Sequence, residues 1–236
     1  AGTHRILDRH LAEKPDDPLG YMVRASAYLF SELHRLRILE AEFLVDDDRI
    51  KAKKKDRPDE AVKLAMQEAL AQAKRHAEVR LAANPGDEDA LFTMCAVSGI
   101  ETDYAALVEK RQLGSLAYAR QSQRYAVRLL NQNPHYYDAY LTAGVSEYLV
   151  GSMPFFMRWF VRFDEVKGSK QKAVENLKLV AQSGLYLRPF AKILLSIIHL
   201  REKRPAESER MLREFAREYP GNPLVRQELA RLEQRR

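Results

Sequence analysis

The chain contains 236 residues, of which 46% are hydrophobic and 31% are charged, and its net charge is +6 at pH 7. This balance excludes intrinsic disorder, which requires few apolar residues and a high net charge. The 10 glycines and 10 prolines are too few for a fold built from many strands and turns, so the composition favours long helices. The mild positive charge permits weak affinity for anionic partners without specifying one.

Cys95 is the single cysteine, so the chain forms no intramolecular disulfide and no thiolate metal cluster. Charged residues interrupt the apolar runs before they reach the ~20 residues that a bilayer-spanning helix needs. No signal peptide is visible. Because the chain begins at Ala1 within a helical pattern, we expect that the native N-terminus is missing, which leaves both the cytoplasm and the periplasm open as locations.

Hydrophobic periodicity predicts an all-α chain. In chain order, helices are expected over 3–13, 19–45, 59–83, 88–103, 104–132, 136–150, 169–183, 188–203, 205–218 and 223–234. The polar stretch 46–59 is expected to be an exposed loop. Neither a strand-like alternation nor a Gly/Ser-rich linker divides the chain, so we predict one domain over residues 1–236.

Four segments of the chain align on a shared proline: 4–28 on Pro15, 74–97 on Pro85, 123–148 on Pro134 and 209–232 on Pro220. In each segment an amphipathic helix stops at the proline, which cannot continue a helix. Polar residues follow, and the predicted N-caps of the next helix are Asp17, Asp87 and Asn222. Ten residues after each proline stands a small residue, namely Ala25, Cys95, Gly144 and Ala230.

This pattern resembles the tetratricopeptide repeat (TPR), in which helix A crosses helix B at a small residue and a proline follows helix B. The large apolar residue of early helix A has counterparts in Tyr21, Leu91 and Tyr140. A further unit lacks the leading proline: 169–184 corresponds to helix B, 189–203 to a helix A with Ser196 in the small position, and 205–220 to the next helix B. The resemblance implies an α-α superhelix, a right-handed solenoid of antiparallel helix pairs with some lengthened helices.

The sequence contains no phosphate-binding loop, dinucleotide-binding glycine pattern, zinc-protease motif or serine-hydrolase motif. No two histidines stand three or four residues apart, so no helical two-histidine metal site is predicted. We therefore expect no catalytic residue, no cofactor and no metal. An alternative is an enzyme whose site is assembled from distant polar groups, such as Glu32, His34 and Arg35 or residues 136–138.

The resemblance also indicates where a partner would bind. Helix A lines the inner curve of such solenoids, and its inward positions here are Met22, Ser26 and Leu29, then Phe92, Ala96 and Gly99, then Leu141, Val145 and Tyr148. Some TPR proteins clamp a peptide carboxylate with Lys and Asn at these positions. The residues here are mostly apolar or small, so we expect an apolar peptide or helix as the ligand. The alternative is that neighbouring helices cover these side chains.

Segment 151–163 concentrates aromatic and methionine side chains around Arg158, and Phe156 and Trp159 belong to it. It is interpreted as core between repeats, as a partner-binding anchor or as an interfacial membrane helix. The basic run 49–57 follows three aspartates and has no interleaved aromatic residues, which disfavours nucleic-acid binding. The leading prediction is a non-catalytic scaffold that binds a protein or peptide. An adaptor for a membrane surface or for nucleic acid is the weaker alternative.

Overall fold

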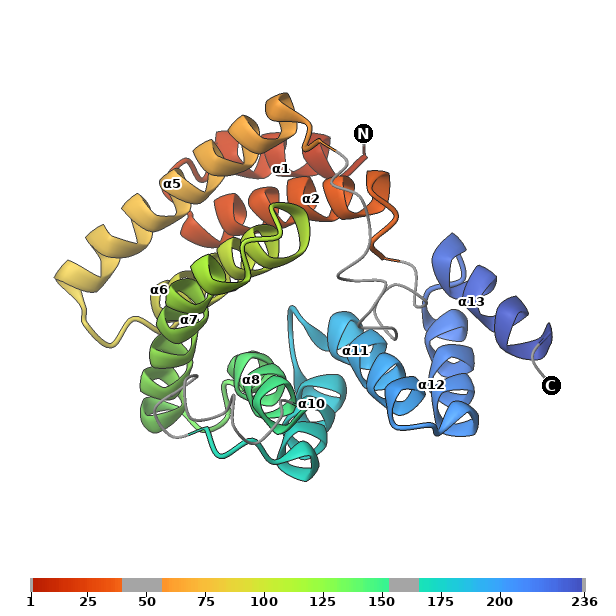
Figure 1. Cartoon of the computed structure of the whole chain (residues 1–236). Helices are drawn as coiled ribbons and strands as arrows, with labels where there is room; N and C mark the ends of the chain where they lie inside the picture. The colour runs from red at the N-terminus through yellow and green to blue at the C-terminus, as the bar shows by residue number, and fades with distance from the viewer. Residues whose placement is uncertain (1, 40–56, 153–165, 235–236) are drawn as a thin grey trace. The chain divides into compact units, whose positions relative to one another are not determined.

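The computed structural model describes residues 2–39, 57–152 and 166–234, and every regular element among them is helical (Figure 1). The all-α prediction is therefore confirmed for this part of the chain. The elements in order are α1 (Gly2–Glu13), α2 (Pro18–Arg35), α5 (Glu60–Ala83), α6 (Glu88–Asp103), the π-helix η1 (Tyr104–Val108), α7 (Gln112–Gln132), the 3-10 helix η2 (Tyr137–Ala139), α8 (Tyr140–Ser152), α10 (Lys170–Ser183), α11 (Arg188–Arg201), α12 (Pro205–Glu218) and α13 (Pro223–Gln234).

Two predicted helices end differently from the expectation. The helix predicted over 19–45 ends at Arg35, and Arg37 takes a left-handed backbone conformation with φ 57°. The helix predicted over 104–132 is divided into η1 and α7, because Lys110 has φ 59°. A left-handed residue breaks the helical hydrogen-bond pattern, and neither position carries the glycine that would signal such a break in the sequence.

The predicted caps are confirmed. The Asp17 carboxylate accepts hydrogen bonds from the backbone N–H groups of Leu19 and Gly20 at 3.1 and 3.2 Å. The Asp87 carboxylate accepts from Ala90 N–H at 2.9 Å, and Asn222 Oδ1 accepts from Leu224 N–H at 3.0 Å. Each cap satisfies backbone donors that the first helical turn leaves without partners.

The chain forms two compact units. Of the described residues, unit 1 contains 2–36 and 57–135, and unit 2 contains 37–39, 136–152 and 166–234. In unit 1, α2 packs against α1, α5 and α6, and α6 packs against α5 and α7. Figure 1 shows α1, α2 and α5 running alongside one another in this unit. In unit 2, α8 packs against α10, α10 against α11, α11 against α12 and α12 against α13.

Helix α6 is the central element of unit 1. Its fully buried residues are Ala90, Leu91, Phe92, Thr93, Met94, Cys95, Val97, Ser98 and Ile100. Contrary to the expectation from the apolar runs, Glu88–Val108 is long and apolar enough to cross a membrane by length and composition. A core helix passes the same test, and 61% of its apolar window is buried inside the unit. The packing of α2, α5 and α7 around α6 accounts for this apolar character.

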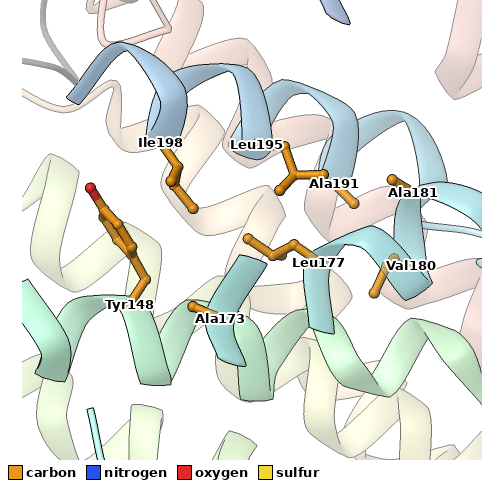
Figure 2. Close-up of a cluster of buried hydrophobic side chains, with 8 residues drawn as sticks. All are labelled: Tyr148, Ala173, Leu177, Val180, Ala181, Ala191, Leu195 and Ile198. Atoms are coloured by element: carbon orange, nitrogen blue, oxygen red, sulfur yellow. The ribbon is translucent and has the colours of Figure 1, made fainter. Parts of the chain in front are cut away.

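The core of unit 2 lies where α8, α10 and α11 meet. Figure 2 shows Leu177 of α10 facing Leu195 and Ile198 of α11, with Tyr148 of α8 beside them. A second apolar cluster joins α12 to α13 through Leu212, Phe215, Val225 and Leu232. Both clusters remove large apolar surfaces from water, which is the main stabilising contribution in such helix pairs.

The predicted small positions are buried at three of the four aligned sites. Ala25 and Cys95 are buried, with 0% and 2% exposure. A β-carbon added at Gly144 would lie 2.9 Å from Leu177 Cγ, so α8 and α10 meet closely there. Ala230 is exposed instead. It lies on α13, the last described helix, and its side of the helix is open to solvent.

Candidate functional site

Four of the predicted groove residues are packed in the interior of their units. Met22, Leu29 and Phe92 are 3%, 2% and 1% exposed, and Tyr148 is 8% exposed. These four side chains lie on α2, α6 and α8 and are buried among the helices of their own units, so none of them is exposed as an open groove would require. Their burial agrees with the alternative interpretation, in which neighbouring helices cover these side chains.

The remaining predicted groove residues are half-buried or lie outside the described chain. The Ser26 hydroxyl donates a hydrogen bond to the backbone carbonyl of Met22 at 3.1 Å. Leu141 and Val145 pack against the core cluster of unit 2. Phe156, Arg158 and Trp159 lie outside the described residues, as does most of the basic run 49–57.

Helices α2 and α8 expose apolar side chains at positions other than the predicted ones. Phe30 is 38% exposed and Leu149 is 53% exposed. Both stand fifteen residues after an aligned proline, Pro15 and Pro134. Val23, two turns before Phe30 on α2, is 37% exposed. Phe30 and Leu149 are therefore large apolar side chains that are partly exposed at matching positions of α2 and α8.

A buried carboxylate connects the end of α2 to the start of α5. Glu32 is 1% exposed and accepts two hydrogen bonds from the Arg35 guanidinium, at 2.8 and 2.7 Å. It also accepts the backbone N–H of Asp59 at 3.0 Å. The hydrogen bonds from Arg35 hold the pKa of Glu32 below its ordinary value, although burial acts in the opposite direction.

Glu147 has the same role in unit 2. Its carboxylate accepts the backbone N–H groups of Lys167 and Ser169, at 3.3 and 2.7 Å. Ser169 in turn caps α10 through Lys172 N–H at 3.2 Å. Sequence reasoning did not identify the role of Glu147 or of Glu32 as an inter-helix contact. The sequence pattern that could have indicated these contacts is a single glutamate within an apolar helical stretch. A buried carboxylate there needs a hydrogen-bond or ionic partner.

Tyr104 of η1 lies near several charged groups of unit 1. Its hydroxyl is buried and has no hydrogen-bond partner among the described residues. Burial raises the pKa of Tyr104, and the carboxylates of Glu109, Glu32 and Glu60 raise it further. The side chain is therefore a protonated phenol near neutral pH, suited to donating a hydrogen bond. Glu109 is paired with Lys63, whose ammonium lies 2.9 Å away.

Burial also raises the pKa of Asp103, to about 7. This half-buried carboxyl precedes η1 directly. Single-turn π-helices often occur at functional sites. Asp103, the last residue of α6, and Tyr104, the first residue of η1, are the titratable groups at the start of this one. Both favour the protonated form, which makes them hydrogen-bond donors at acidic to neutral pH.

The polar groups considered for an assembled active site are engaged in the structure. Asp138 accepts the backbone N–H groups of Leu185 and Leu187 at 2.8 and 2.6 Å, which joins η2 to the turn before α11. His34, by contrast, is exposed. Among the described residues, no group of three or more His, Cys, Asp or Glu side chains is arranged to hold a metal ion.

Helix α7 carries an exposed basic row that sequence reasoning also missed. Arg120, Arg124 and Arg128 recur every four residues and are all exposed. The helix contains neither aspartate nor glutamate. Residues four apart share one face of a helix, so the three guanidinium groups project from the same side. The sequence could have indicated this row, because arginines recur every four residues in a helix that has no acidic residue.

Comparison with known proteins gives no relative: no protein-family model, no curated protein and no solved structure matches the chain.

Proposed function

We propose that this chain is a divergent TPR-like repeat protein that binds a peptide or protein segment and performs no catalysis itself. The observation that carries the proposal is the exposure of Phe30 and Leu149 at the same position of two repeat units. Burying an exposed Phe or Leu side chain against a partner contributes about 1.5–3 kcal/mol of hydrophobic free energy.

The order of helix contacts supports the repeat assignment. In unit 1, α2 pairs with α5 and α6 pairs with α7, while α2 also packs against α6. A stack of A/B helix pairs has this order, because each helix A lies beside its own helix B and the next helix A. The buried small residues Ala25, Cys95 and Gly144 agree with the close crossings that such pairs require.

The binding surface differs from the one that the motif alone implies. The positions expected to face inward are interior, so the partner would instead contact the outer stripe of α2 that includes Val23 and Phe30, and the Leu149 side of α8. These are two separate surfaces, one on each unit. Isolated exposed apolar residues are common. These two are selected because they occupy one motif position in two repeats, whereas Ile100, at that position of a third repeat, is buried.

Site-specific photo-crosslinking tests this proposal. A photoreactive phenylalanine analogue is placed at position 30 or 149 and, as a control, at position 64, because Leu64 of α5 is 64% exposed. In an extract of the native cells we expect one protein to be captured from positions 30 and 149 and not from position 64. Capture of no protein at either test position would contradict the proposal.

The captured protein is then purified and its affinity measured. We expect the double variant F30A/L149A to bind at least about tenfold more weakly, whereas L64A/V79A, which removes two other exposed apolar side chains, keeps the affinity. Circular dichroism verifies that both variants remain folded. An equal loss of affinity in the two double variants would show that binding does not depend specifically on positions 30 and 149.

A further inference from the structure

The three arginines of the α7 row are exposed on one face of the helix, and none of them has an acidic partner among the described residues. Elsewhere arginines form close ion pairs: Arg35 with Glu32 at 2.7 Å, Arg80 with Asp87 at 2.8 Å and Arg213 with Glu209 at 2.8 Å. No ion pair within the described chain involves Arg120, Arg124 or Arg128. Like charges four residues apart repel one another on a helix, so the row does not stabilise α7.

The spacing of the three arginines determines how the negative charges of a ligand must be spaced. Four residues of α-helix rise about 6 Å, so Arg120, Arg124 and Arg128 present positive charge at regular intervals over two turns. The Arg128 guanidinium donates a hydrogen bond to the carbonyl of Pro85, which restricts that side chain before any partner arrives. Leu113 and Ala117, which are exposed on the preceding turns, extend the row with an apolar end.

We propose that this face of α7 binds an acidic helix of a protein partner, with carboxylates four residues apart opposite the three arginines. Arginine binds carboxylates in a planar, two-point geometry. The surface lies on a different helix from Phe30 and Leu149, so the inference does not depend on the function proposed above.

Two other anionic ligands fit the face less well. Tyr118 and Tyr125 of α7 are half-buried, so no ring beside the arginines is fully available as a stacking platform for the bases of a single-stranded nucleic acid. An interfacial membrane helix inserts a broad apolar face, whereas Leu113 is the one large apolar side chain among the exposed positions of α7. The charge and the narrow apolar end instead match a helix that mixes carboxylates with a few apolar residues.

Two synthetic helical peptides of identical composition test the inference. In the first, glutamates recur every fourth residue on one face; in the second, the same glutamates are distributed around the helix. Binding to the full chain is measured by fluorescence anisotropy at low and at physiological salt. We expect the first peptide to bind about tenfold more tightly, and its affinity to fall with salt because the contact is ionic.

Variants then locate the contact. R120Q/R124Q/R128Q should reduce binding of the first peptide to the level of the second, and R120K/R124K/R128K should restore part of it. The matched control R210Q/R213Q/R217Q removes the same charge from α12, where Arg213 is paired with Glu209 and Glu233, and should bind like the parent. Circular dichroism confirms the fold of each variant.

Three results would overturn the proposal: equal binding of the two peptides, equal losses in the α7 variant and the α12 control, or tighter binding of a thymidine oligonucleotide or of anionic phosphatidylserine vesicles that depends on the same three arginines.

Discussion

Gly144 shows how a single residue sets the distance between two helices. A β-carbon at this position would lie 2.9 Å from Leu177 Cγ and 3.1 Å from the backbone oxygen of Ala173. The backbone oxygen cannot move without displacing α10. Gly99 of α6 is different, because an added β-carbon would meet only Ser122 Oγ at 3.8 Å, an ordinary contact. Replacing Gly144 by alanine would therefore cause a clash, whereas the same replacement at Gly99 would not.

We expect G144A to destabilise the protein by about 1–3 kcal/mol, since overpacking in a close crossing outweighs the better helix propensity of alanine. The control G99A should be neutral or stabilise by up to about 1 kcal/mol, because the propensity gain acts there without a clash. Urea unfolding followed by circular dichroism gives both free energies. A G144A protein as stable as the parent would show that α8 and α10 are not constrained at this point.

At the scale of elements, the turns between helices repeat a common arrangement. His10 Nε2 lies 2.6 Å from Asp17 Oδ2, and Arg80 donates to Asp87 at 2.8 Å. In both cases a residue five before the proline contacts the N-cap two after it, so the end of one helix is fastened to the beginning of the next. The sequence predicted the N-caps and the prolines of this arrangement. The basic partners of the caps, His10 and Arg80, were identified only from their contacts in the structure.

Glu32 performs the corresponding task between α2 and α5, and it makes that junction sensitive to pH. The pKa of Glu32 is lowered from its ordinary value of 4.5, chiefly by the hydrogen bonds from Arg35. A carboxyl with a depressed pKa contributes stability above its unfolded pKa and loses it as the pH falls through the folded value. The contribution is therefore complete near neutral pH and disappears in acid below about pH 4.5.

We expect E32Q to be about 1–3 kcal/mol less stable than the parent at pH 7, because the amide accepts the hydrogen bonds less well and carries no charge for Arg35. The difference should shrink as the pH is lowered below about 4.5. Urea unfolding at a series of pH values measures it. A constant difference across that range would rule out the ion pair as its source.

At the scale of the whole molecule, each unit has its own core. In unit 1 the centre is α6, with Phe92 and Leu91 fully buried. In unit 2 it is the cluster around Leu177, which is 0% exposed and contacts α8 and α11 side chains. Two separate cores in one chain allow the units to differ in local stability.

The substitution L177A tests this division. It removes a fully buried side chain, which typically costs about 2–5 kcal/mol. Amide hydrogen exchange should accelerate in α8, α10 and α11, while α2, α5 and α6 keep the protection of the parent. F92A, in the core of unit 1, should produce the reverse pattern. Uniform acceleration in both units would indicate a single cooperative domain.

What the sequence alone determined is local: the positions of most helices, the prolines that end them, the N-caps Asp17, Asp87 and Asn222, and the small residues at close crossings. These follow from hydrogen bonds and sterics within a few residues. Only the tertiary structure decided that Met22 and Phe92 are interior while Phe30 and Leu149 are exposed, and that the chain divides into two units. Burial depends on every helix packed around a side chain, and periodicity along one helix does not contain that information.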